Sequence, residues 1–195
     1  MKTLLWDKYG EHVEARVLDE VNIMKFTENR MMRNQCIQEF GFAVPTEDVI
    51  KEISQLGEII ELGAGLGYWA SCIYEVSGQI SCYDYRVPGP FSKNNYYFKH
   101  SPLLFDVKEG SIQECYGTLA PVLMLIWPCY NSLFAYAALK AFGGRTLVYV
   151  GEGSGGCCAD DRFFHELAAR WVLRKELNIP TWEGIHDRVY IYDRK

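Results

Sequence analysis

Short apolar runs that end in glycine, proline or acidic residues recur along this chain, and stretches with helical periodicity separate them. Buried strands are predicted at residues 59–62, 80–83, 103–107, 122–127 and 146–150. Helices are predicted at 47–55, with Thr46 as N-cap, at 68–74, at 131–141, with Asn131 or Ser132 as cap, and after Asp160. This alternation of strands and helices is typical of an α/β protein with a parallel sheet.

The C-terminal part predicts two further strands, at 172–177 and 189–192. The connector between them, residues 178–187, is too short for a helical crossover, so these two strands should be antiparallel neighbours. We therefore expect a Rossmann-like, mostly parallel sheet of seven strands with the last strand reversed and helices on both faces. Residues 1–195 should form a single domain, in which 1–45 are a helical N-terminal extension and 46–195 are the core.

Two regions outside the regular pattern are candidates for ligand contacts. Residues 1–40 have apolar positions at helical spacing and predict two helices, and Arg30 and Arg33 lie one turn apart, where they either reach a carboxylate or form a solvated face. Residues 85–102 are rich in proline, glycine and asparagine, so they predict a long irregular connection. Its aromatic residues, Phe91 and 96–98, either stack on a planar substrate or anchor the loop.

The segment Glu61-Leu62-Gly63-Ala64-Gly65-Leu66-Gly67 follows the first predicted strand and precedes a helix. Glycines at such a turn let the backbone approach a ligand closely. Asp84 ends the next strand, where a carboxylate can accept hydrogen bonds from both hydroxyls of a ribose. The glycine spacing differs from the Gly-x-Gly-x-x-Gly of dinucleotide-binding folds. These residues predict a site for a nucleoside-containing ligand.

This pattern of glycines and acid resembles the first motifs of class I S-adenosylmethionine-dependent methyltransferases. The resemblance implies that S-adenosyl-L-methionine is the cofactor and that Glu61, Gly63, Gly65, Gly67 and Asp84 help to hold it. It also implies that Tyr85 flanks the adenine and that Ser111 lies near the adenine edge. Backbone groups of Trp127 should face the amino acid part of the cofactor.

Trp127-Pro128-Cys129-Tyr130 resembles the (Asp/Asn/Ser)-Pro-Pro-(Tyr/Phe) motif of methyltransferases that act on nucleobase amino groups. Trp127 stands where that family has the polar residue that holds the amine, so the match is incomplete. Residues 151–161 and 179–188 resemble a little-studied branch of methyltransferase-like proteins, from which no substrate follows.

Four residues are candidates for catalysis because the predicted topology brings them to the ligand edge: Tyr130, Glu152, His186 and Asp187. A histidine is suited to take a proton from an acceptor near neutral pH, and a neighbouring carboxylate can orient its ring. Alternatively, His186 and Asp187 merely cap a turn, with Asp187 pairing with Arg188.

Composition and charge disfavour several kinds of partner and site. A net charge of −5 disfavours a nucleic-acid partner, although it leaves room for a local basic patch. The seven cysteines include no Cys-x-x-Cys pair, which favours reduced thiols in a cytoplasmic protein over disulfides or a metal site. No apolar run approaches the ~20 residues of a membrane span, and the first residues lack the apolar stretch of a signal peptide.

The sequence therefore predicts an enzyme that transfers a methyl group from S-adenosylmethionine. A small-molecule acceptor is favoured, then a protein, then a nucleic acid. The alternatives are a non-catalytic, methyltransferase-like partner subunit and an N-methyltransferase acting on a nucleobase. A nicotinamide-dependent oxidoreductase is disfavoured by the glycine spacing.

Overall fold

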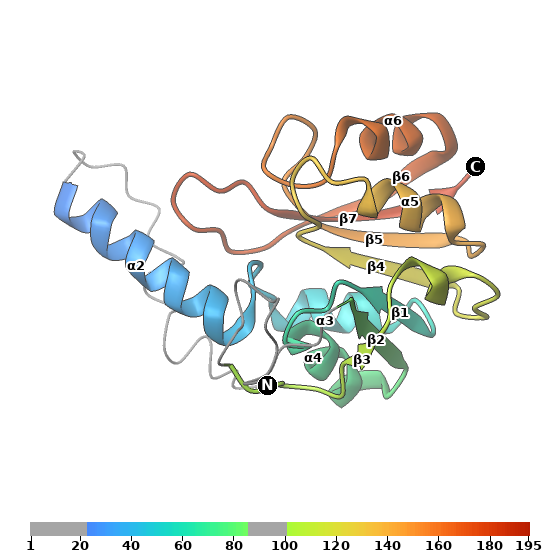
Figure 1. The fold of residues 1–195 in the computed structure, drawn as a ribbon, viewed down its shortest axis with the longest axis horizontal. Coiled ribbons are helices and arrows are strands. Elements are labelled where there is room, and N and C mark those ends of the chain that lie inside the picture. The colour runs from blue at the N-terminus through green and yellow to red at the C-terminus, as the bar shows by residue number, and fades with distance from the viewer. Residues whose placement is uncertain (1–22, 86–100) are drawn as a thin grey trace.

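The computed structural model describes residues 23–85 and 101–195, which form a central sheet between two layers of helices (Figure 1). The strands are β1 (Ile59–Leu62), β2 (Ile80–Asp84), β3 (Lys108–Glu109), β4 (Val122–Ile126), β5 (Thr146–Gly151), β6 (Trp171–Asn178) and β7 (Arg188–Arg194). The helices are α2 (Ile23–Phe40), α3 (Glu47–Ser54), α4 (Tyr68–Ser77), the 3₁₀ helix η1 (Ile112–Cys115), α5 (Phe134–Ala141) and α6 (Asp161–Arg170).

The seven strands form one sheet in the order β3-β2-β1-β4-β5-β7-β6. The pairs β1–β2, β2–β3, β1–β4 and β4–β5 are parallel, whereas β7 runs antiparallel to both β5 and β6. This confirms the predicted Rossmann-like sheet with a reversed last strand. Because the parallel strands end at one edge, the loops that follow β1, β2, β4 and β5 gather there.

Alternation along the strands divides the core into two layers. Ile59, Met124 and Val148 pack with buried residues of α3 and α4 on one face. Ile60, Leu123 and Leu147 pack with buried residues of α5 and α6 on the other. Successive side chains of a strand point to opposite faces, so a sheet covered on both sides needs continuous apolar strands, as the sequence has here.

The helix starts agree with the sequence at two places and differ at one. The Thr46 side chain accepts a hydrogen bond from the Val49 N–H, and the Asp160 side chain does the same for the Phe163 N–H, as expected of N-caps. Neither Asn131 nor Ser132 is the N-cap of the next helix, because Leu133 has that position, although Ser132 Oγ accepts a hydrogen bond from the Phe134 N–H at 3.3 Å. That helix, α5, begins only at Phe134, because Asn131 adopts φ 51° and donates its N–H to the Ala159 carbonyl at 2.7 Å.

The predicted strand at 103–107 was also wrong, because the strand in this region is the two-residue β3 that follows it. The apolar residues that suggested a strand serve packing instead. Phe105 lies 5.2 Å from the Tyr74 ring, Val107 is buried, and the Leu104 N–H donates to the Leu66 carbonyl. A short apolar run cannot distinguish these two uses.

The N-terminal extension is a single helix, α2, over the part that the structure describes. Its C-terminal end joins the core through Cys36 and Phe40. The predicted helix before residue 23 and the aromatic residues of 86–100 lie outside the described residues. Within residues 23–85 and 101–195, no helix is long and apolar enough to cross a membrane.

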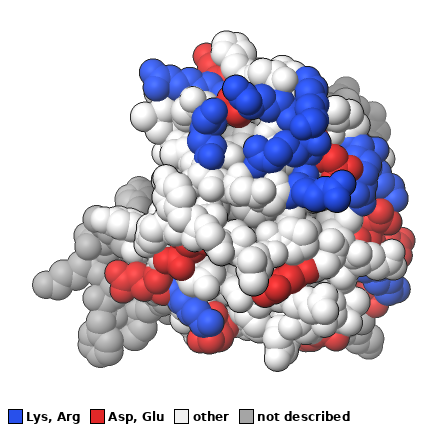
Figure 2. Space-filling model, turned by 90° about the vertical axis from the view of Figure 1, so that its right-hand side faces the viewer, with Lys and Arg blue, Asp and Glu red and all other residues white. Residues whose placement is uncertain are grey.

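Lysines and arginines gather at the edge of the sheet opposite the loops named above (Figure 2). Five cations stand where α5, α6 and β7 end or just before β5 begins, and we call them the amino-edge cluster: Lys140, Arg145, Arg170, Arg194 and Lys195. Lys140 and Arg170 both pair with Glu166, at 3.5 and 3.3 Å. Lys195 Nζ donates to carbonyls at the end of α6, and Arg194 donates to the Phe142 and Gly144 carbonyls after α5. Cations at helix C-termini interact favourably with the helix dipoles.

Candidate active site

A cavity of about 810 Å³ opens where β1, β2 and β4 end, at the carboxyl edge of the sheet. This volume lies in the upper part of the range of about 300–1,000 Å³ that is typical of ligand pockets. One half of the cavity is lined by the glycine loop after β1, by Asp84 at the end of β2 and by Tyr85, which follows it. The other half is lined by α2 and the loop after it, by the segment after β4, and by the loop after β5.

The glycine loop turns sharply between β1 and α4. Gly63, Gly65 and Gly67 all have positive φ, at 74°, 55° and 78°. The Gly63 N–H donates to the Tyr83 carbonyl at 2.8 Å, which ties the loop to the neighbouring strand. Gly63 and Gly65 line the cavity, whereas Gly67 is the N-cap of α4 and packs against Phe105 and Val107.

Two carboxylates line this half of the cavity. Asp84 accepts a hydrogen bond from the Gly65 N–H at 2.9 Å, which fixes the carboxylate and the glycine loop relative to each other. Glu61 is 2% exposed, and its Oε2 has no hydrogen-bond partner among the described residues. Burial, and secondarily the charge of Asp84, raises the pKa of Glu61 to about 8. An orphaned buried carboxylate oxygen that faces a cavity is a place for a donor or cation from a ligand.

These features fit S-adenosylmethionine, whose ribose hydroxyls and ammonium group are donors and whose sulfonium is a cation. Glu61, Gly63, Gly65 and Asp84 would hold it, and Tyr85, which is 65% exposed, lines the cavity beside Asp84. Ser111 precedes η1 and is not among the residues that line the cavity, so its predicted contact with the adenine stays a prediction.

Asp84→Ala should weaken the binding of S-adenosylmethionine by about 1–3 kcal/mol, because ribose hydroxyls would lose a charged acceptor. Isothermal calorimetry measures the affinity. Asp106→Ala, which removes an exposed aspartate outside the cavity, is the matched control. If both variants bind the cofactor as the wild type does, Asp84 does not hold it.

Trp127 has φ 47°, a conformation that is strained for a bulky residue. Four contacts hold it there. Its N–H donates to the Val150 carbonyl at 2.8 Å, and its indole Nε1 donates to Asp187 Oδ2 at 2.9 Å. The ring stacks on Phe42 with centroids 4.9 Å apart and an interplanar angle of 14°, and Arg33 lies 5.5 Å from its centroid. Residues other than glycine that are held in such strained backbone conformations are often found at functional sites.

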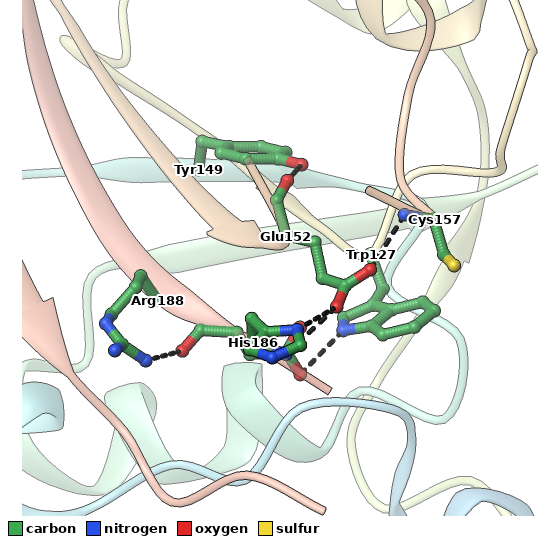
Figure 3. A network of polar contacts seen from close by, with 7 residues as sticks. Trp127, Tyr149, Glu152, Cys157, His186 and Arg188 are labelled. Carbon is green, nitrogen blue, oxygen red and sulfur yellow. Dashed lines mark hydrogen bonds and ion pairs between the residues drawn. The ribbon is translucent and has the colours of Figure 1, made fainter. Parts of the chain in front are cut away.

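Beside Trp127, Glu152 links two loops (Figure 3). Its Oε1 accepts a hydrogen bond from the His186 N–H at 2.9 Å and lies 3.3 Å from His186 Nδ1, and its Oε2 accepts one from the Cys157 N–H at 2.8 Å. Burial alone would raise the pKa of Glu152, but the two backbone hydrogen bonds outweigh it and lower that pKa. Glu152 is therefore a carboxylate that fixes loop geometry.

Asp187 lies in the same network and is 1% exposed. Burial raises its pKa to about 7, against the hydrogen bond from Trp127, which lowers it. Arg188 donates to the backbone carbonyl of Asp187 and pairs with Glu176, so no side-chain pair between Asp187 and Arg188 is seen.

Among the four residues predicted to act in catalysis, Tyr130 lines the cavity, whereas Glu152, His186 and Asp187 do not. The His186 side chain is 83% exposed, so its ring is available to solvent beside Glu152. The topology brings these residues to the predicted edge, and their catalytic roles stay predictions.

Several residues at the cavity were not identified from the sequence. Phe40 and Phe42 line it from the end of α2 and the following loop, and Phe134 and Cys157 line it from α5 and the loop after β5. Arg33 lies over the Trp127 ring, a contact that neither predicted alternative described, whereas Arg30 is exposed. Within residues 23–85 and 101–195, no group of His, Cys, Asp and Glu is placed to hold a metal ion.

No protein-family model matches the sequence, and no curated protein sequence matches it either. Solved structures do match its fold. An O-methyltransferase family protein from Burkholderia thailandensis has a TM-score of 0.51 at 14% identity, covering 98% of this chain and 69% of that one.

A second similar structure is the 1,6-didemethyltoxoflavin-N1-methyltransferase of Burkholderia thailandensis with bound 1,6-didemethyltoxoflavin and S-adenosylhomocysteine. It has a TM-score of 0.51 at 12% identity and covers 76% of each chain. At such identities the likeness concerns the fold. The described part of the chain therefore has the fold of the class I S-adenosylmethionine-dependent methyltransferases.

Proposed function

We propose that the protein binds S-adenosylmethionine at the glycine loop and transfers its methyl group to a small-molecule acceptor. The observation that carries this proposal is the pair of carboxylates, Glu61 and Asp84, beside a glycine turn in a cavity whose other half is aromatic. The cavity has a polar half for a nucleoside and an apolar half for a second molecule.

The cofactor supplies a methyl group that its sulfonium already activates, so the protein's task is alignment and the exclusion of water. Glu61 would accept hydrogen bonds from the amino acid part, and Asp84 from the ribose. The wall formed by Phe42 and Trp127 would place the acceptor. A base would be needed only for an acceptor that carries a proton at neutral pH. In that case Tyr130 and the His186–Glu152 pair are the candidates.

Two measurements test the proposal. Calorimetry with S-adenosylmethionine and with NAD distinguishes the cofactor class, and we expect binding of the former alone. Incubation with methyl-labelled cofactor and a metabolite extract then reports transfer, which should be slower in Asp84→Ala when the cofactor is below saturation. Binding without transfer to any extract component would favour the non-catalytic partner subunit, and absence of binding would contradict the proposed methyl transfer.

A further inference from the structure

The acceptor half of the cavity is built mainly from aromatic rings. Its described lining includes Phe40, Phe42, Trp127 and Tyr130, whereas the Phe134 ring lies beside Gly63 of the glycine loop. The indole N–H of Trp127 is already bonded to Asp187, so the Phe42–Trp127 stack offers the cavity hydrocarbon rather than a donor. A wall of this kind favours a planar molecule, because aromatic pairs gain from offset stacking and edge-to-face contact.

The acceptor half contains little that can take a proton. Among the described residues that line it there is no histidine, lysine, aspartate or glutamate, and the ionisable side chains are Tyr130, Cys129 and Cys157. Burial, and then the neighbouring Glu152, raises the pKa of the Cys157 thiol, which therefore stays protonated near neutral pH. An acceptor that already has a free lone pair needs no base.

The surroundings also favour a positive charge over a negative one. The described lining contains Asp84 and Glu61 but no lysine, arginine or histidine. Because the pKa of Glu61 is raised to about 8, its side chain is an uncharged acceptor near neutral pH rather than an anion. Two described cations act on the buried Asp187, namely Arg33, which lies over Trp127, and Arg188, and neither is part of the lining. Aromatic rings attract cations as well, by about 0.5–2 kcal/mol for each well-placed pair.

From this combination of aromatic walls, acidic surroundings and a base-poor lining, we propose that the acceptor is an uncharged nitrogen heteroaromatic whose ring nitrogen bears no hydrogen. This inference rests on the proposed function. The nitrogen lone pair forms the new bond to the methyl carbon, and the carbon–sulfur bond breaks with its electron pair left on sulfur. The products are S-adenosylhomocysteine and an N-methylated ring cation. The positive charge passes from sulfur to the ring, and no proton is released.

The product cation provides a binding test that does not need turnover. With S-adenosylhomocysteine at saturation, calorimetry compares N-methylquinolinium with 1-methylnaphthalene, its uncharged isostere, and with 1-naphthoate, an anion of similar size. The cation should bind about 2- to 30-fold more tightly than the neutral isostere, and the anion most weakly.

Tyr130→Leu should reduce the preference for the cation, because Tyr130 lines the cavity and is 70% exposed, so its loss leaves the core intact. Tyr116→Leu is the matched control, since Tyr116 is also 70% exposed and lies outside the lining. Equal effects of the two variants would contradict the proposed role of the aromatic wall.

The same protein is then given methyl-labelled cofactor with quinoline or with 1-naphthol, which must lose a proton to accept a methyl group. Label in N-methylquinolinium supports the proposal. If S-adenosylhomocysteine binds but the cation has no advantage over its isostere, or if label enters 1-naphthol, the acceptor class is wrong and the proposed function stands. If S-adenosylhomocysteine does not bind at all, the proposed function itself fails.

Discussion

Gly67→Ala should lower the free energy of unfolding by about 2–5 kcal/mol. A Cβ at this position would lie 2.7 Å from Val107 Cγ2 and 2.9 Å from Phe105 Cβ, both closer than packed carbon atoms can approach. The backbone there also has φ 78°, which costs a non-glycine residue about 1–2 kcal/mol. Urea denaturation measures the change. Gly67 thus has a structural role whether or not it touches the cofactor.

Gly78→Ala is the matched control for this experiment, because Gly78 caps the other end of the same helix, α4. Its φ is 67°, and a Cβ there would meet no atom within 4 Å. The free energy of unfolding of this control should fall only by the cost of a positive φ for alanine, about 1–2 kcal/mol. If Gly67→Ala costs no more than Gly78→Ala, the contacts with Phe105 and Val107 relax freely and the packing argument is wrong.

The stability of the ligand-free protein should fall as the pH rises from about 4 to about 7, and Asp187→Asn should flatten this fall. Burial raises the pKa of Asp187 to about 7 in the folded protein, whereas an aspartate in the unfolded chain titrates near 3.9. Between these values the unfolded chain binds fewer protons than the folded one, so the free energy of unfolding decreases with pH. The limit is about 1.4 kcal/mol per pH unit, or about 4 kcal/mol over the window.

Urea denaturation at a series of pH values compares the wild type with Asp187→Asn, in which the amide oxygen still accepts from the Trp127 indole. Glu61, whose pKa is raised to about 8, adds a slope of the same sign to both proteins, so the difference isolates Asp187. Asp106→Asn, at an exposed position, is the control. Parallel curves for wild type and Asp187→Asn would mean that Asp187 is ionised when buried.

Much of the fold was predictable because burial on both faces leaves a simple trace in the sequence. Runs such as Val122–Ile126 are apolar throughout, and the short connector before β7 allows only a reversed strand. The errors arose where tertiary contacts override local pattern. Phe105 and Val107 pack around Gly67 rather than in a strand, and Asn131 is held outside α5 by its bond to Ala159.

The position of the cavity was predictable from the sequence, but the arrangement of the side chains around it was not. Parallel topology brings the residues after β1, β2, β4 and β5 to one edge, so Asp84 and Tyr130 reach the cavity as expected. Topology does not say which way a side chain points after its strand ends. The indole N–H of Trp127 bonds to Asp187, and Glu152 bonds to both Cys157 and His186. These contacts depend on side-chain directions, which the spacing of residues in the sequence does not reveal.

The amino-edge cluster gives the molecule an electrical polarity. Lys140 lies in the last turn of α5, Arg145 precedes β5 and Arg194 ends β7, so all three lie at one edge of the sheet, whereas Asp84 ends β2 at the cavity on the other edge. A cationic ligand such as S-adenosylmethionine approaching this dipole would be turned and drawn towards its negative pole, at the cavity mouth, while the positive pole repels it. Its association rate should therefore fall as salt is added, because screening at a Debye length of about 8–10 Å shortens the reach of that field.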